Sequence, residues 1–116
     1  MVDKLKLLLE EVIAEKGIVT LFAVMRMDDL TDKWSVVFSA PWVTDKTKNS
    51  DFSYLVVKLN KFLSPEENSS IARVGMFEKN HHIVQLFSKY KADQKIENEK
   101  VNGFKIHEAY ILASNP

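Results

Sequence analysis

The sequence predicts an α+β fold, with a single-layer, mainly antiparallel sheet of four to five strands and helices packed on one face. Apolar side chains recur every three or four residues in 3–16 and 51–63, the spacing of amphipathic helices. In residues 17–27 most side chains are apolar at both the odd and the even positions, which is typical of a central strand covered on both faces. Asn102-Gly103 stands between two strand-like segments and predicts a tight hairpin.

The first helix is expected over residues 3–16, with Asp3 as its cap. Gly17 follows the last periodic residue and suits the left-handed backbone that often ends a helix. Its charges oppose the helix dipole, because lysines come early and glutamates late. Packing of the apolar stripe is therefore expected to supply most of the stability of this helix.

A second strand is expected over residues 34–40, joined to the central strand by the polar turn 28–33. Its apolar side chains alternate with serines, which predicts a strand with one exposed face. Pro41 ends the strand, because proline has no N–H to donate to a neighbouring strand.

A helix start is marked most clearly at Ser64. Proline follows at the first helical position, and Glu67 stands three residues after the serine, which is the pattern of a capping box. We expect a short helical turn over 65–69 and a strand over 71–77. Gly75 inside that strand indicates a bulge or a close approach of another group to the backbone.

Residues 80–91 allow two interpretations. Their apolar residues have helical spacing, with Asn80 as a cap, and this interpretation is favoured; the segment also fits the second arm of a hairpin. With strands at 95–101 and 104–113, the helical interpretation gives the order α-β-β-α-β-α-β-β. The alternative gives α-β-β-α-β-β-β, which resembles the roadblock and profilin-like arrangements in element order.

The chain is expected to form one domain over residues 1–116. Sixteen basic residues balance sixteen acidic ones, so no nucleic-acid partner is expected. The absence of cysteine excludes disulfides and thiolate chemistry. No signal peptide and no apolar run of about 20 residues is found, so we expect a cytoplasmic protein without a membrane association. No cofactor-binding motif is present, and no cofactor is expected.

Two groups of residues are candidates for a site. Carboxylates converging from a hairpin tip can bind Mg²⁺ or Ca²⁺, although acidic residues also favour turns for their own hydrogen bonding, which is the preferred explanation here. These are Asp28, Asp29 and Asp32. An aromatic stripe can form an interface or stack on a ligand, and more commonly it is a sheet face buried under a helix. This stripe consists of Trp34, Phe38 and Trp42.

The histidines offer a weaker metal site. His81 and His82 are adjacent, and adjacent side chains diverge both in a strand and near a helix start. A ligand set that adds His107 and Glu108 conflicts with the alternation of the final strand. A pair of surface histidines near a turn is the preferred explanation.

The leading functional hypothesis is a small, soluble, non-enzymatic interaction module that self-associates as a homodimer or binds a protein partner. Helix 3–16 and strand 34–40 are the expected dimerisation elements, because the strand is predicted to be half exposed and ends at a proline. One alternative is a metal-dependent hydrolase or nuclease-like toxin that uses the acidic hairpin turn. Another is a small-ligand sensor, with its pocket between the sheet and its covering helix near Trp42 and Phe62.

Overall fold

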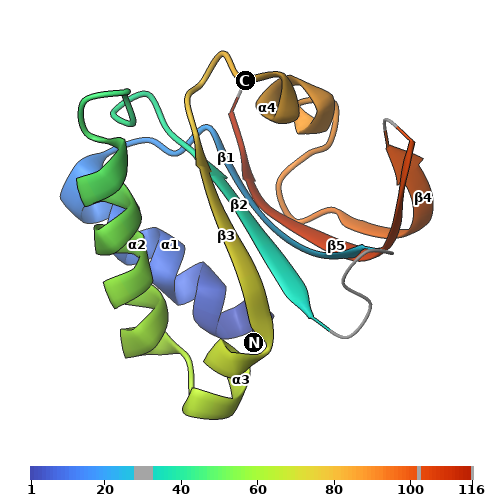
Figure 1. Cartoon of the computed structure of the whole chain (residues 1–116), viewed down its shortest axis with the longest axis horizontal. Coiled ribbons are helices and arrows are strands. Elements are labelled where there is room, and N and C mark those ends of the chain that lie inside the picture. The colour runs from blue at the N-terminus through green and yellow to red at the C-terminus, as the bar shows by residue number, and fades with distance from the viewer. Residues whose placement is uncertain (28–32, 102, 116) are drawn as a thin grey trace.

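The computed structural model describes residues 1–27, 33–101 and 103–115, and its order of elements confirms the predicted α+β class (Figure 1). The segment 80–91 contains a helix, so the favoured interpretation is confirmed and the all-strand alternative is wrong. The elements are α1 (Val2–Lys16), β1 (Leu21–Met27), β2 (Trp34–Ser39), α2 (Lys48–Phe62), α3 (Pro65–Ser69), β3 (Ile71–Phe77), α4 (His82–Phe87), β4 (Lys95–Val101) and β5 (Phe104–Ser114).

The five strands form one mixed sheet in the order β3-β2-β1-β5-β4. β1 pairs antiparallel with β2 and with β5, and β4 pairs antiparallel with β5. β2 and β3 are parallel, because α2 and α3 carry the chain back to the start of the sheet before β3 begins. The sheet is thus mainly antiparallel, as predicted, with one parallel pair at its edge.

One face of the sheet packs against α1 and α2. Phe22 of β1 and Phe38 of β2 are fully buried there, with their ring centroids 5.5 Å apart in an edge-to-face arrangement. Leucines of both helices complete this core, and the fully buried ones include Leu5, Leu8, Leu55 and Leu59. The apolar stripes predicted for the two long helices are therefore the surfaces that cover the sheet.

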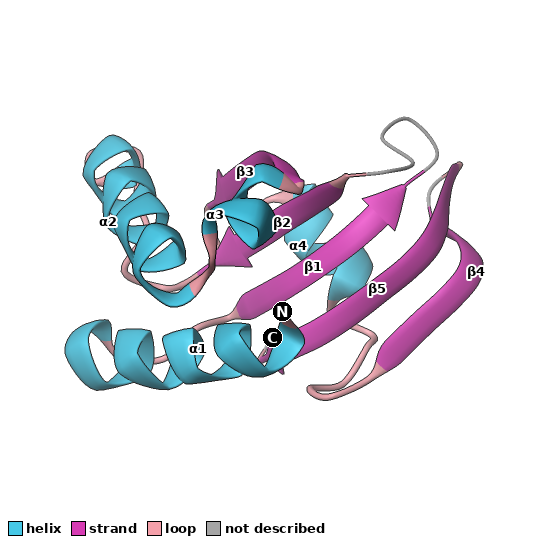
Figure 2. Ribbon diagram, turned by 90° about the horizontal axis from the view of Figure 1, so that it is seen from below, coloured by secondary structure: helices cyan, strands magenta, loops and turns pink. Residues whose placement is uncertain are grey.

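The opposite face carries α4, which corrects the expectation that all helices pack on one face. Figures 1 and 2 both show α4 across the sheet from α1 and α2. Val84 and Phe87 of α4 pack on Ala23 of β1 and Ile111 of β5 in a second buried cluster. The physical reason is the two-sided apolar pattern of β1, since an apolar row on the second face also needs a cover.

β2 is an interior strand, and the prediction that it is half exposed is wrong. Five of its six residues are buried, because α1 and α2 cover one face and the second cluster covers Val37 on the other. Both of its edges are hydrogen-bonded, to β1 and to β3. Dimerisation through the backbone of β2 is therefore excluded, and β3 and β4 are the edge strands of the described sheet.

Some of the predicted helix ends are confirmed and others are wrong. Ser64 and Glu67 form the predicted capping box, with the Ser64 hydroxyl accepting from the Glu67 N–H at 3.2 Å and the Glu67 carboxylate accepting from the Ser64 N–H at 2.9 Å. Gly17 has φ of +102°, a value that favours glycine, but its ψ of −165° lies outside the left-handed helical conformation that was predicted. Asp3 and Asn80 are not caps: α1 has no side-chain cap, and α4 is capped by the ring of His81.

Ion pairs between α1 and α2 explain the unfavourable charge order of the first helix. Lys58, which is only 8% exposed, lies 2.8 Å from Glu15 and also pairs with Glu11, which takes a second bond from Lys61. The hydrogen bond from Lys58 is the main reason why the pKa of each glutamate is lowered. The late glutamates of α1 therefore stabilise its packing on α2, although their interaction with the dipole of α1 is unfavourable.

Replacement of Ser64 by alanine is expected to lower the free energy of unfolding by about 1 kcal/mol, because it removes the N-cap of α3. Chemical denaturation measures this difference. Ser53→Ala is the matched control, since Ser53 is exposed within α2 and alanine is at least as favourable there. Equal losses in the two variants would contradict a capping role.

Replacement of Glu67 by glutamine is expected to change how the free energy of unfolding depends on pH at acidic pH. Lys4 donates to the Glu67 carboxylate at 2.6 Å, and this bond, with the Ser64 N–H, lowers the pKa of Glu67 from 4.5 to about 2. A lowered folded-state pKa contributes stability above pH 4.5 that is lost as the pH falls toward 2.

Wild type should therefore exceed Glu67→Gln in free energy of unfolding at neutral pH, and the difference should vanish near pH 2. Urea denaturation at a series of pH values gives this comparison. Glu66→Gln is the control on the same helix, as Glu66 is exposed. A difference between wild type and Glu67→Gln that is independent of pH would show that the charge has no part in it.

A candidate ligand-binding cavity

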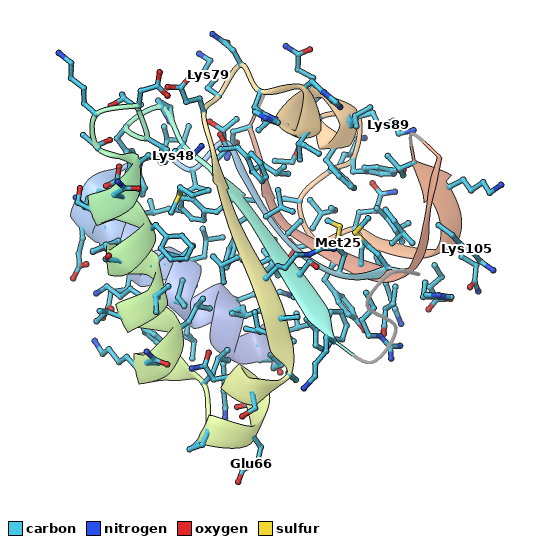
Figure 3. The ribbon with its side chains drawn as sticks, viewed as in Figure 1. Met25, Lys48, Glu66, Lys79, Lys89 and Lys105 are labelled. Atoms are coloured by element: carbon cyan, nitrogen blue, oxygen red, sulfur yellow. The ribbon has the colours of Figure 1, made fainter. Side chains whose placement is uncertain are left out.

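A cavity of about 550 Å³ lies between the sheet and α4, on the face opposite α1 and α2. β1, β2 and β3 form its floor, α4 covers one end, and residues of β4 and β5 close one side. Figure 3 shows Met25 on the side of the sheet that faces α4 and β4. Apolar side chains dominate the lining, among them Met25, Val37, Phe77, Leu86, Phe87 and Ile106.

Gly75 shapes the floor of the cavity. It lies beside Val37 in the parallel register of β2 and β3, and its lack of a side chain makes room for the ring of Phe77. The ring of Phe77 occupies the space above it, so that a β-carbon at Gly75 would stand only 2.5 and 2.8 Å from two ring carbons. The close approach that the glycine predicted is therefore made by an aromatic ring of the same strand.

The short helix α4 is held over the sheet by its buried side chains and by the segment that follows it. Val84 and Phe87 are buried, whereas Ile83 and Leu86 are partly exposed and line the cavity. Tyr90 packs on Phe87 and donates its hydroxyl to Glu99 of β4 at 3.0 Å. Burial, followed by this hydrogen bond, raises the pKa of Tyr90 to about 12, so the phenol remains protonated at neutral pH.

Polar groups of the lining gather mainly at the other end of the cavity. Arg73 of β3 lies beside Ser35 of β2 in the register, and its Nε donates to the Ser35 hydroxyl at 3.2 Å. A terminal nitrogen of Arg73 also approaches the sulfur of Met27 at 4.0 Å. His82 at the start of α4 is the other ionisable residue among the described lining residues, none of which is acidic.

The structure places the aromatic stripe on the face away from this cavity. Phe38 is fully buried in the core beneath α1 and α2, and its ring lies 5.6 Å from that of Trp42. Trp42 is partly buried and donates its indole N–H to the Ile18 carbonyl at 3.0 Å. Trp34 is partly buried beside Tyr110, with ring centroids 6.1 Å apart. A role for the two tryptophans in an interface stays a prediction.

The ligand pocket that the sequence placed near Trp42 and Phe62 stays a prediction, and the cavity described above lies on the opposite face of the sheet. Both residues pack against the core that α1 and α2 form on the sheet. The cavity described above forms where the covering helix is short, because α4 has only 6 residues and leaves part of the second face bare. Nothing in the pattern of the segment 80–91 indicated which face its helix would cover.

The acidic turn of Asp28, Asp29 and Asp32 lies outside the described residues, so its metal site and the hydrolase alternative stay predictions. His81 and His82 stack with ring centroids 5.9 Å apart, and His81 serves as the cap of α4. Within residues 1–27, 33–101 and 103–115, no group of three or more His, Asp or Glu side chains is arranged to hold a metal ion.

A second polar cluster lies on the face of α1, around Glu108 of β5. Arg26 donates to one carboxylate oxygen at 2.7 Å and Tyr110 donates to the other at 2.7 Å. The Tyr110 hydrogen bond, with a smaller contribution from Arg26, lowers the pKa of Glu108. Lys95 lies 3.6 Å from the same carboxylate and 2.8 Å from Glu97. The charges neutralise one another, as is usual for cross-strand pairs on an open sheet face.

Comparisons of the chain with protein-family models, with curated proteins and with solved structures find no match. In the part of the chain that the structure describes, no helix has both the length and the apolar character needed to cross a bilayer.

Proposed function

We propose that this chain is a non-catalytic binding module that holds a small apolar ligand in the cavity between the sheet and α4. The observation that supports the proposal is the cavity itself, at about 550 Å³ with a mainly apolar lining. Small-molecule sites in proteins have volumes of roughly 300 to 1,000 Å³, apolar walls and a few polar groups, and this cavity has all three properties.

Burial of apolar surface favours the binding of a ligand in the cavity. Met25, Phe87 and Ile106 are held at the cavity wall by the two-sided sheet and by α4, so the hollow exists before a ligand arrives. An apolar ligand gains about 25 cal/mol for each Å² of apolar surface removed from water. A preformed site spends little of that gain on ordering side chains. Affinity for an uncharged apolar molecule is therefore the basic property expected of this chain.

Replacement of Val37 by phenylalanine is expected to weaken binding of Nile red, an uncharged apolar dye, by about tenfold, or ~1.4 kcal/mol. Val37 lines the cavity beside Gly75, and the larger ring would occupy ligand volume. Fluorescence titration measures the affinity. Val57→Phe is the matched control, because the same substitution at a residue 64% exposed on α2 leaves the cavity unchanged.

Val101→Phe tests the cavity from β4, on a different element of the lining, in case Val37→Phe folds poorly. Circular dichroism confirms folding of each variant before titration. Nile red that binds wild type, Val37→Phe and Val101→Phe with equal affinity, or that does not bind wild type at all, would show that the cavity is no ligand site.

Self-association is a second candidate function, which the free edge of β3 favours. β3 ends the sheet and contains one charged residue, Arg73, with no lysine or proline to block pairing. Two copies can join their β3 edges antiparallel about a twofold axis, so that each strand satisfies the backbone groups of the other. The edge of β3 therefore replaces β2 as the expected dimerisation element, because β2 is paired with a strand on each side.

Replacement of Ala72 by lysine is expected to shift such a dimer toward monomer by about tenfold in dissociation constant, because Ala72 is exposed on β3 and paired edges would bring two lysines together. Sedimentation equilibrium over a range of concentrations measures the constant. Val57→Lys adds the same charge on α2 as a control. Wild type that is monomeric at every concentration would refute self-association.

A further inference from the structure

We infer that His81 is a pH-sensitive switch for the cavity: its neutral ring holds the first turn of α4 in place over the sheet, and its protonation loosens that turn and weakens ligand binding. This inference rests on the proposed function of the cavity and adds its regulation. Two contacts of His81 with the cavity wall and the chemistry of imidazole as a helix cap support it.

His81 lies next to the cavity wall and contacts it on two elements. Its Nδ1 accepts a hydrogen bond from the Ile83 N–H of α4 at 3.1 Å. Its ring centroid also lies 4.7 Å from that of Phe77 on β3. Ile83 and Phe77 both line the cavity, whereas His81 itself is exposed to solvent. One solvent-accessible side chain thus connects a strand of the cavity floor to the helix that covers one end.

A histidine cap differs from the usual caps because protonation removes its acceptor. Helices are commonly capped by Ser, Thr, Asn or Asp, and the first three keep an acceptor oxygen that does not titrate in mild acid. A neutral imidazole with its proton on Nε2 leaves Nδ1 able to accept, whereas an imidazolium has a proton on both nitrogens and can only donate. Histidine is also the side chain that ordinarily titrates between about pH 5 and 8. Mild acidification therefore removes the acceptor for the Ile83 N–H.

The charges around the cap act in the same direction. A protonated ring at His81 stands at the N-terminal end of α4, where the helix dipole disfavours a positive charge. The ring of His82 is stacked on it at 5.9 Å, so protonation of both histidines adds repulsion between like charges. Phe77, the β3 residue against the ring, is uncharged. Glu78 and Lys79 precede His81 in the turn, and among the described residues neither side chain bonds to its ring.

The first turn of α4 depends on this cap more than the rest of the helix does. Val84 and Phe87, in the middle and at the end of α4, are buried against the sheet. His82 and Ile83 form the start of the helix and line the cavity, and neither is fully buried. Loss of the cap is therefore expected to free the first turn while the rest of α4 stays packed. The cavity would then lose part of its contact with an apolar ligand.

Fluorescence titration of the full chain with Nile red at about pH 7.5 and at about pH 5.5 tests the switch across the range in which histidine titrates. The dye has no group that titrates between these values. We expect wild type to bind it about fivefold more weakly at the lower pH, the change that corresponds to loss of one helix cap.

His81→Asn replaces the titratable cap by one that accepts at both pH values, so its affinity should vary by less than about twofold. His81→Ser gives the same comparison where His81→Asn does not fold. His81→Ala should bind at both pH values about as weakly as wild type does at the lower one. His82→Gln is the matched control, because it removes the neighbouring histidine and leaves the cap, and it should keep most of the pH dependence.

Equal affinity of wild type at the two pH values would overturn the switch and leave the cavity as a site without pH regulation. Persistence of the wild-type pH dependence in His81→Asn would also overturn it, because another group, such as His82 in the cavity lining, would then be the cause. Nile red that does not bind wild type even at the higher pH would overturn the proposed function, and the switch with it. Circular dichroism at both pH values confirms that each variant is folded.

Discussion

The whole structure depends on burial of both faces of β1. Its side chains alternate between Phe22 and Val24 on one face and Ala23 and Met25 on the other, and all four are buried. Two-sided burial requires a neighbour at each edge and a layer on each face. β2 and β5 supply the edges, α1 and α2 cover one face, and α4 with the curled β4 partly covers the other. The cavity is the part of the second face that this cover leaves open.

Much of the fold follows from local patterns. Helical spacing predicted α1 and α2, the capping box at Ser64 predicted α3, and Asn102-Gly103 predicted the hairpin of β4 and β5. The parallel pairing of β3 with β2 could not be predicted, because β3 has the same apolar content that an antiparallel edge would have. Its position is decided by the crossover through α2, a property of the folded chain.

The candidate site was harder to predict than the fold. Gly75 gave a correct signal of close approach, but the sequence did not show that the ring of Phe77 would make it. Arg73 carried no signal at all, since a single arginine in a strand is usually a surface residue. Its position at the cavity follows from the pairing of β3 with β2, which brings Arg73 beside Ser35. A site made by strand pairing becomes visible only when the pairing is known.

The pairing of β1 with β5 has a consequence for the synthesis of the protein. Arg26 and Glu108 are 82 residues apart in the chain, and Asn115 reaches back 96 residues to the Val19 carbonyl. A ribosome therefore releases β1 long before the strand that completes its second edge. During that interval β1 can pair with β2, and β2 with β3, but the second edge of β1 has no partner strand. The nascent chain is thus most exposed to misassociation before β5 emerges, and contacts of such long range favour slow folding.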